Sequence, residues 1–257
     1  MRKFLLLGDK GYLGSYLNNV LDCDVLADRI IYNNGNEYQY IINCIAKPNV
    51  SYCETNIEDS FYSNAYIVND IKTLYPKSKI INFSSYYVYD KDGLCDELSP
   101  TNDTLSYSKQ KLLSESLNQN GLNFRLGKLF GNLLSNQYRL TEKVLHEDIL
   151  HIDNILFNPA SVKCIEAVLK HDDFLENNLG LFNLANNGYV SHYEYAKFIL
   201  DYLGIKKQLY EIKNPGKKFI NHGRFLMSTE KISSSIKLNH WKDDLMIFLD
   251  QWAAIHL

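Results

Sequence analysis

Long apolar runs are absent from this sequence. No stretch reaches the roughly 18 consecutive apolar residues that a membrane-spanning helix needs, so we expect no membrane partner. Arg2 and Lys3 precede an apolar run at residues 4–7, as at the start of a signal peptide, but Gly8 ends that run too early for one.

Cysteine is scarce, and the charges of the two signs nearly balance. The five cysteines are odd in number and include no Cys-x-x-Cys pair, so the sequence indicates neither a disulfide framework nor a structural zinc site. We therefore expect a cytoplasmic protein. The formal net charge of −3 provides no basic surface for a nucleic-acid backbone, so we expect no nucleic-acid partner.

The composition that remains is that of an ordinary globular protein. The 257 residues are 46% hydrophobic and 22% charged, which excludes disorder and low-complexity scaffolds. This length allows one large domain or two interleaved lobes.

Three glycines near the N-terminus follow a short apolar run. Residues 4–7 are Phe-Leu-Leu-Leu, which is typical of a strand buried on both faces of a parallel sheet. Gly8, Gly11 and Gly14 come next, and residues 15–21 are predicted to form a helix. Such a turn lets backbone N–H groups and a helix N-terminus approach a pyrophosphate. Strand, glycines and helix in this order predict dinucleotide binding.

Two charged residues leave the identity of the dinucleotide open. An acidic residue that binds the ribose is expected about 20 residues after the first glycine, and Asp28 lies at that distance from Gly8. Arg29 follows directly and could instead bind a 2′-phosphate. Asp28 favours NAD(H), whereas Arg29 favours NADP(H).

Further apolar runs alternate with helical patterns along the first half of the chain. Residues 40–46, 80–85 and 122–129 are predicted strands, and residues 57–74 and 105–117 are predicted helices. This alternation predicts an α/β fold built on a doubly wound parallel sheet.

One Tyr-x-x-x-Lys pair has the context of a catalytic site. Of five such pairs, only Tyr107 and Lys111 lie on a predicted helix soon after a buried strand that ends in Ser84-Ser85. Helical spacing puts both side chains on one face. A nearby ammonium is expected to lower the pKa of the phenol, which would make Tyr107 a general acid for the reduction of a carbonyl. A serine hydroxyl at the strand end can hydrogen-bond the same oxygen.

These motifs resemble one known family, the extended short-chain dehydrogenase/reductases, and within it the dTDP-4-dehydrorhamnose reductase group. Residues 8–14 look like the nucleotide loop of the family, and residues 43–46 look like its strand end beside the cofactor. The resemblance implies NADP(H) or NAD(H) as the cofactor. The cofactor-binding residues that it implies, together with the two charged candidates above, are Gly8, Gly11, Tyr12, Leu13, Gly14, Asp28, Arg29, Asn43, Cys44, Ala46, Asn64, Tyr107 and Lys111.

The same resemblance implies a reaction. Residues 83–89 are similar to the family segment that places the catalytic hydroxyl on Ser85, while Tyr107 and Lys111 match the acid and its helper. The implied activity is NAD(P)H-dependent reduction of the 4-keto group of a nucleotide-linked 6-deoxysugar, in the biosynthesis of surface-polysaccharide sugars. The nucleotide sugar is then the partner, and its expected contacts are Ser85, Tyr86, Tyr87 and Arg224.

The implied architecture is a Rossmann-type domain over residues 1–131 and a smaller, mainly helical substrate lobe over residues 132–257, partly interleaved with the main sheet. Residues 158–161, 180–185 and 228–231 resemble three later segments of the family, but the stretch between Gly131 and Asn158 is shorter than usual. By analogy with the fold, a homodimer would pair through the helices at 57–74 and 104–118.

Two other functions stay open: a nucleotide-sugar 4-epimerase that retains its NAD, and a non-catalytic regulatory subunit that binds a dinucleotide. A dehydratase is disfavoured, because Tyr86 and Tyr87 stand where such enzymes carry an Asp-Glu pair. For Arg125 an ion pair is expected. No metal is expected, since three histidines match no metal-site spacing: His146, His151 and His192.

Overall fold

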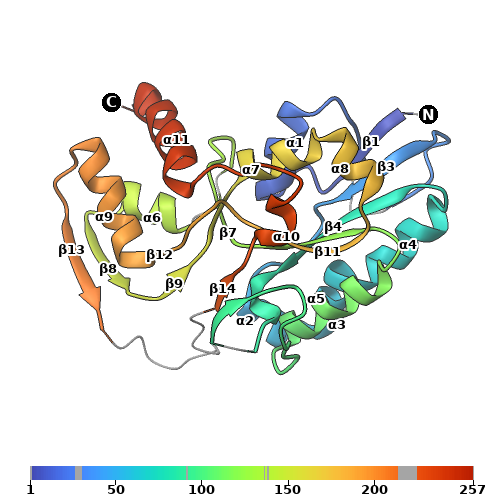
Figure 1. Cartoon of the computed structure of the whole chain (residues 1–257), viewed down its shortest axis with the longest axis horizontal. Coiled ribbons are helices and arrows are strands. Elements are labelled where there is room, and N and C mark those ends of the chain that lie inside the picture. Colours follow the sequence, from blue (N-terminus) through green and yellow to red (C-terminus); the bar gives the residue numbers. More distant parts are fainter. Residues whose placement is uncertain are drawn as a thin grey trace.

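A six-stranded parallel sheet forms the centre of the protein, with helices on both of its faces (Figure 1). The computed structural model describes residues 2–26, 31–90, 92–135, 137, 139–213 and 225–256. In spatial order the strands are β2 (Asp24–Leu26), β1 (Arg2–Leu7), β3 (Tyr38–Asn43), β4 (Lys79–Ser85), β6 (Leu122–Leu126) and β11 (Gly180–Leu184). The predicted doubly wound α/β fold of the Rossmann type is confirmed.

Strand β1 is apolar from Phe4 to Leu7 because both faces of the sheet are covered. On one face, Phe4 and Leu6 pack with residues of three helices: α1 (Tyr12–Val20), α7 (Val162–Leu169) and α8 (Asp172–Asn177). On the other face, Leu5 and Leu7 pack with α4 (Ile67–Leu74). Successive side chains of a strand point to opposite faces, so an unbroken apolar run supplies both cores.

The order of the strands reverses at β1. The chain leaves β1 to form β2 on one side, and β3 then pairs on the other side of β1. In open parallel sheets, ligands bind in the crevice outside the carboxyl ends of the strands at such a reversal. Residues that follow β1 and β3 therefore lie where a ligand site is expected.

A ladder of buried asparagines crosses three neighbouring strands. Asn43, Asn82 and Asn123 are paired in register on β3, β4 and β6. The Asn43 amide donates to Asn82 Oδ1 at 3.2 Å, and the Asn82 amide donates to Asn123 Oδ1 at the same distance. All three side chains are buried, so these bonds satisfy polar groups that water does not reach.

The helix predicted at 57–74 is not a uniform α-helix. It consists of α3 (Ile57–Phe61), a π-helical turn η1 (Tyr62–Tyr66) and α4, which ends at Leu74, before Pro76. Ile57, the first residue of this predicted helix, is 51% exposed. The short helix α2 (Val50–Thr55) precedes this layer, and α5 (Ser106–Leu117) packs beside it on the same face of the sheet (Figure 1).

Two predicted strands end earlier than their apolar runs. The run at 40–46 leaves the sheet after Asn43, and residues 44–46 form a loop. The run at 122–129 breaks at Gly127, after which β7 (Lys128–Phe130) pairs with β10 (Pro159–Ser161). A Cβ at Gly127 would lie 2.3 Å from the carbonyl oxygen of Asn158, so only glycine allows this close approach.

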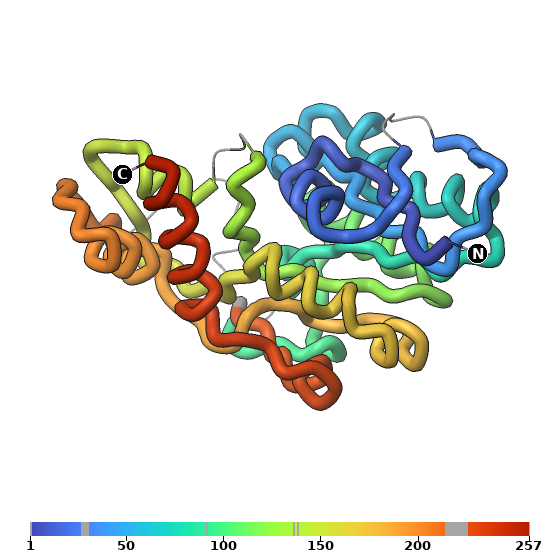
Figure 2. Tube along the Cα trace, turned by 90° about the horizontal axis from the view of Figure 1, so that it is seen from above, coloured from blue at the N-terminus to red at the C-terminus, as the bar shows by residue number. Residues whose placement is uncertain are grey.

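A second core lies beside the sheet, built from helices and short strand pairs of the C-terminal half (Figure 2). Its elements are α6 (Leu140–His146), α9 (His192–Leu203), α11 (Trp241–His256), β8 (Ile149–Asp153) with β13 (Gln208–Ile212), and β9 (Leu156–Phe157) with β12 (Val190–Ser191). Ser191 caps α9, because its hydroxyl accepts from the N–H of Glu194.

Other segments of the C-terminal half join the main sheet and its helical layers. Strand β11 is an edge strand of the sheet, α7 and α8 pack on one face, and α10 (Glu230–Ser233) contacts β11. The small pair β5 (Gly93–Cys95) and β14 (Phe225–Met227) is parallel. The boundary at 131/132 stays a prediction. Within the described ranges, no helix has the length and apolar character needed to cross a membrane.

Candidate active site

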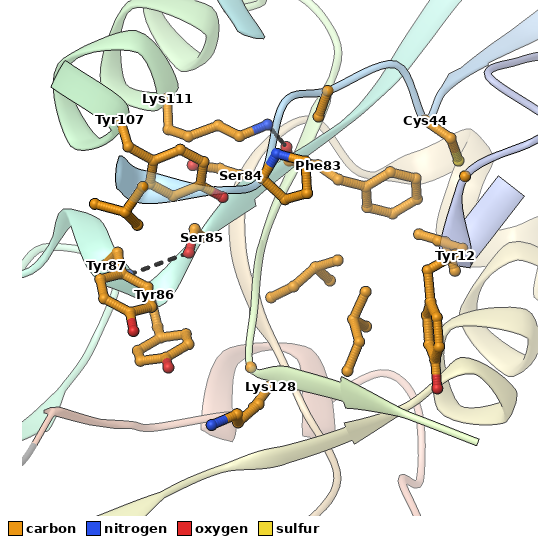
Figure 3. Close-up of a pocket in the computed structure, with 18 of the residues that line it drawn as sticks. Tyr12, Cys44, Phe83, Ser84, Ser85, Tyr86, Tyr87, Tyr107, Lys111 and Lys128 are labelled. Carbon is orange, nitrogen blue, oxygen red and sulfur yellow. Dashed lines mark hydrogen bonds between the residues drawn. The ribbon is translucent and has the colours of Figure 1, made fainter. Parts of the chain in front are cut away.

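A cavity of about 370 Å³ opens at the carboxyl ends of β1, β3 and β4 (Figure 3). Its volume falls in the range of small-molecule binding sites. It brings together eleven of the residues predicted from the sequence: Gly11, Tyr12, Leu13, Asn43, Cys44, Ala46, Ser85, Tyr86, Tyr87, Tyr107 and Lys111.

The glycine loop shapes one end of the cavity. Gly8 has a φ of +82°, and a Cβ there would lie 2.8 Å from the backbone of Cys44, while a Cβ at Gly14 would lie 2.0 Å from the carbonyl oxygen of Gly8. These two glycines are packed under the loop and do not line the cavity. Gly11 lines the cavity and is the N-cap of α1. Because glycine has no side chain that could cap the helix, the first N–H groups of α1 are available to an anion. A dinucleotide pyrophosphate fits this arrangement.

The loop after β3 forms the wall beside the glycines. The Cys44 N–H donates to the carbonyl of Leu7, and Asn43 Oδ1 accepts from the N–H of Ile45. The Asn43 side chain is thus used within the protein, between this turn and the asparagine ladder. Burial raises the pKa of the Cys44 thiol, which keeps it protonated at neutral pH.

Ser85, Tyr107 and Lys111 meet on the wall formed by β4 and α5 (Figure 3). Ser85 is the last residue of β4, and its Oγ accepts from the N–H of Tyr87 at 3.3 Å. Tyr107 is in the first turn of α5 and Lys111 is one turn later, so both side chains leave the same helix face. Lys111 Nζ donates to the carbonyl oxygen of Phe83 at 2.9 Å and is fixed by it.

The predicted direction of the Tyr107 pKa is wrong for this structure. Burial, the largest effect, raises the pKa of Tyr107 to about 12, although a hydrogen bond with Ser85 opposes it. Burial also lowers the pKa of Lys111 to about 8. The reason is that desolvation disfavours both charged forms. At neutral pH the phenol carries its proton, which is the state that a general acid needs.

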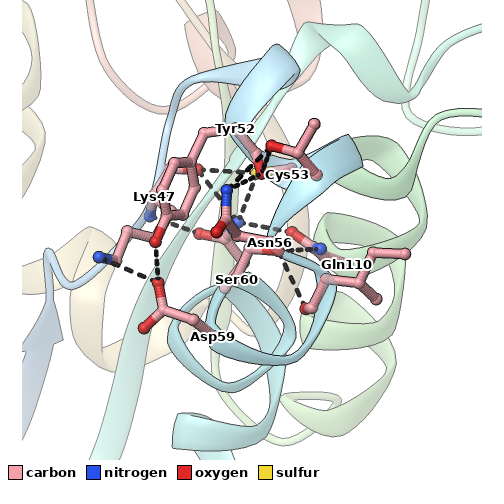
Figure 4. A network of polar contacts seen from close by, with 10 residues as sticks. Lys47, Tyr52, Cys53, Asn56, Asp59, Ser60 and Gln110 are labelled. Atoms are coloured by element: carbon pink, nitrogen blue, oxygen red, sulfur yellow. Dashed lines mark hydrogen bonds and ion pairs between the residues drawn. The ribbon is translucent and has the colours of Figure 1, made fainter.

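Asn64 lies behind the cavity wall and does not line it. From the π-helical turn its Oδ1 accepts from the N–H of Lys47 at 2.7 Å, and its amide donates to the Lys47 carbonyl and to Gln110 Oε1 (Figure 4). Cys53 Sγ contacts the same carbonyl. The predicted cofactor-binding residue Asn64 therefore holds the loop after β3 against α5.

A carboxylate fixes the start of the helix that carries Tyr107. Glu54 accepts from the Ser106 N–H at 2.7 Å and from the Ser106 hydroxyl at 3.1 Å. A negative charge at a helix N-terminus stabilises the unpaired N–H groups there. The Tyr107 and Lys111 side chains thus start from a helix whose end is anchored to α2.

Comparison with known proteins identifies the family. The chain matches the model of the RmlD substrate binding domain over residues 2–254. It belongs to this family. Its fold is similar to solved dTDP-4-dehydrorhamnose reductases from Clostridium acetobutylicum (TM-score 0.80, 20% identity) and from Bacillus anthracis in complex with NADP (TM-score 0.82, 16% identity). Each similarity covers 98% of this chain and 99% of the other. The spore coat polysaccharide biosynthesis protein SpsK of Bacillus subtilis is 22% identical over an alignment 287 residues long that covers 98% of this chain and 98% of SpsK.

Three residues that the family resemblance or the charge pattern suggested lie outside the described residues: Asp28, Arg29 and Arg224. Arg125, for which an ion pair was expected, is buried under the site and forms that pair with Glu115. Its Nε and Nη2 donate to the two carboxylate oxygens at 2.9 and 2.7 Å. A bidentate pair of this kind fixes β6 to α5.

Sequence reasoning missed two basic residues that line the cavity, Lys128 and Arg139. Lys128 follows Gly127 within the predicted strand at residues 122–129. A lysine in an otherwise apolar run could have indicated that this residue has a function. Arg139 precedes α6 and lies over the Tyr12 ring, 4.1 Å from its centroid. No sequence pattern indicates this contact, because it depends on how α6 packs against α1.

Proposed function

We propose that the protein is an NAD(P)H-dependent oxidoreductase that reduces the 4-keto group of a nucleotide-linked 6-deoxysugar. The observation that carries the proposal is the meeting of Ser85, Tyr107 and Lys111 on one wall of a cavity whose other end is a glycine loop and helix N-terminus. Membership of the RmlD substrate binding domain family supports it. The name of the Bacillus subtilis relative supports a role in making surface-polysaccharide sugars.

The roles that we assign to the three side chains combine their positions with the family resemblance. The nicotinamide, when bound, supplies a hydride to the carbonyl carbon of the sugar. Tyr107, protonated at neutral pH, gives its phenolic proton to the carbonyl oxygen, and the Ser85 hydroxyl donates a hydrogen bond to that oxygen as charge develops on it. Lys111 holds the nicotinamide ribose, and its ammonium beside Tyr107 stabilises the phenolate left after proton transfer. Solvent then restores the proton.

Tyr86 and Tyr87 supply the aromatic wall next to the reacting group. Their ring centroids lie 4.7 Å apart, and the Tyr87 ring meets Tyr107 edge-on at 6.3 Å. We infer that they contact the sugar. The choice between NADP(H) and NAD(H) stays open, since Asp28 and Arg29 lie outside the described residues.

The test is oxidation of NADPH and of NADH by the purified protein with a panel of nucleotide-linked 4-keto-6-deoxysugars. Tyr107→Phe should lower kcat by about 10²- to 10⁴-fold, the usual contribution of a general acid. Tyr193→Phe is the matched control, because Tyr193 and Lys197 have the same spacing on a helix away from the cavity. Undiminished turnover by Tyr107→Phe would refute the assigned role.

Two other outcomes identify the alternatives. Interconversion of C4 epimers without net oxidation of the nicotinamide would indicate an epimerase that retains its NAD. Tight dinucleotide binding without turnover of any sugar would indicate a regulatory binding subunit.

A further inference from the structure

A hollow lined by several basic side chains adjoins the catalytic cavity. Lys128 and Arg139 line both, and the hollow is also lined by Asp153. Helix α6, strand β8 and the start of α9 form the rest of the hollow, with Lys143 and His151 contributing further basic side chains. Figure 3 shows Lys128 on the opposite side of the catalytic cavity from Lys111.

Lys128 is held in place by a chain of polar contacts. Its Nζ lies 3.0 Å from His192 Nε2, and His192 Nδ1 lies 2.7 Å from Asp153 Oδ1. An ammonium can only donate, so Nε2 accepts and the ring is the neutral tautomer with its proton on Nδ1. Burial also lowers the pKa of His192, in agreement with a neutral ring. The carboxylate of Asp153 thus acts on Lys128 across the imidazole.

No carboxylate of the described residues forms a direct ion pair with either cation, although Asp153 and Glu142 lie near enough to act on them. Neither Lys128 nor Arg139 has a carboxylate within 4.0 Å in the part of the chain that the structure covers. Glu142, near Arg139, directs its carboxylate to the Arg139 backbone N–H at 3.2 Å and to the Tyr12 hydroxyl. The Nε of Arg139 is buried and has no hydrogen-bond partner among these residues.

Keeping such charges buried is unfavourable unless something compensates them. Burial, together with repulsion from Arg139 and Lys143, lowers the pKa of Lys128 to about 8, although the charge of Asp153 opposes this. A half-buried cation without a direct ion-pair partner, next to an unpaired N–H donor, is an arrangement that favours binding of an anion. Lys128 also has Phe157 on one side, 5.6 Å from the ring centroid, which limits where its ammonium can go.

We propose that Lys128 and Arg139 bind an oxyanion group of the substrate, either a phosphate of its diphosphate or a carboxylate on its sugar. The inference rests on the proposed function, because it assigns the anion to the substrate of that site; if the anion is a sugar carboxylate, the sugar is a uronate and not the 6-deoxysugar named above. The cofactor phosphates are assigned above to the N-terminus of α1. Lys128 lies instead against Phe157 and His192 of the second core, across the cavity from Lys111.

The experiment measures binding by titration calorimetry to the protein saturated with the dinucleotide that it binds more tightly. The probes are inorganic pyrophosphate, UDP, dTDP, UDP-glucose and UDP-glucuronate. Lys128→Met should weaken binding of the recognised anion roughly 10- to 100-fold, as expected for a hydrogen bond to a charged group. Lys128→Arg should retain part of the affinity, and Lys197→Met, at an exposed lysine of α9, should retain all of it.

The probes separate the two sources of the anion. If the diphosphate is bound, Lys128→Met weakens pyrophosphate and both free nucleoside diphosphates. If a sugar carboxylate is bound, only UDP-glucuronate loses affinity relative to UDP-glucose. The proposal is overturned if the wild-type protein binds none of the probes, or if Lys128→Met and Lys197→Met bind every probe with equal affinity. It is also overturned if Lys128→Met weakens dinucleotide binding as much as it weakens binding of the probes.

The proposed reductase function is judged separately, by turnover and by Tyr107→Phe. A protein that binds these anions through Lys128 but oxidises no reduced nicotinamide would retain the oxyanion site and lose the reductase assignment. If the Lys128→Met variant turns over keto sugars as well as the wild-type protein does, the reductase assignment would stand and the oxyanion site would not.

Discussion

The buried charge of Lys128 predicts a measurable dependence of stability on pH. The ordinary pKa of a lysine is 10.5, and burial lowers that of Lys128 to about 8. Between these two values the unfolded chain still binds a proton at this position while the folded protein has released it. Stability rises with pH wherever the unfolded state binds more protons. The wild-type protein should therefore gain stability across this window relative to a variant without the ammonium.

The size of the gain follows from the same numbers. The interval between about 8 and 10.5, at about 1.4 kcal/mol per pH unit, gives a gain of about 3 kcal/mol. Below pH 8 the folded protein carries the whole cost of burying the charge, so Lys128→Met should be the more stable of the two there. The hydrogen bond lost by His192 offsets about 1 kcal/mol of that advantage.

The assay is urea unfolding of wild type, Lys128→Met and Lys197→Met at intervals from pH 7 to pH 10.5. Lys111, whose pKa burial also lowers to about 8, is present in all three proteins and cancels in the differences. The wild-type curve should approach and then cross that of Lys128→Met as the pH rises, while Lys197→Met should run parallel to wild type. Parallel curves for wild type and Lys128→Met would refute the reasoning that the ammonium is buried at a cost.

Three other substitutions test how the site is supported. Gly14→Ala should lower dinucleotide affinity and destabilise the fold by roughly 1–3 kcal/mol, because its Cβ would overlap the Gly8 carbonyl; fluorescence titration and urea unfolding measure both effects. Glu54→Ala should cost about 1 kcal/mol in unfolding and lower kcat, since α5 loses its N-terminal carboxylate, whereas Glu54→Gln should recover part of both. Glu115→Gln should destabilise by about 3–5 kcal/mol because Arg125 stays buried without its counter-charge, while Glu37→Gln, at an exposed pair, should leave the unfolding midpoint nearly unchanged.

Patterns that depend on neighbouring residues could be predicted from the sequence. The glycine loop needs a strand before it and a helix after it, and the pair of Tyr107 and Lys111 needs only one helical turn, so both are visible in the order of the residues. The family resemblance rests on the same local motifs, and the match over residues 2–254 confirms it.

Properties that depend on burial or on distant segments could not be predicted. Spacing places an ammonium near the Tyr107 phenol, but the depth of the site makes burial the larger effect and raises the pKa. Asn64 has the place of a family asparagine, yet only the packing of the π-helical turn against the Lys47 loop shows that its side chain is already used. Lys128 acquires its environment from His192, 64 positions later.

The asparagine ladder across β3, β4 and β6 links the evolution of three strands. The Asn43 and Asn82 amides each donate to the asparagine of the next strand, so a change at Asn82 leaves the buried Asn43 amide without its acceptor. Asn123 keeps its bonds with Asn118 in that case, because Asn118 both donates to its Oδ1 and accepts from its amide. Related sequences should therefore keep or lose Asn43 and Asn82 together, whereas position 123 should vary together with position 118.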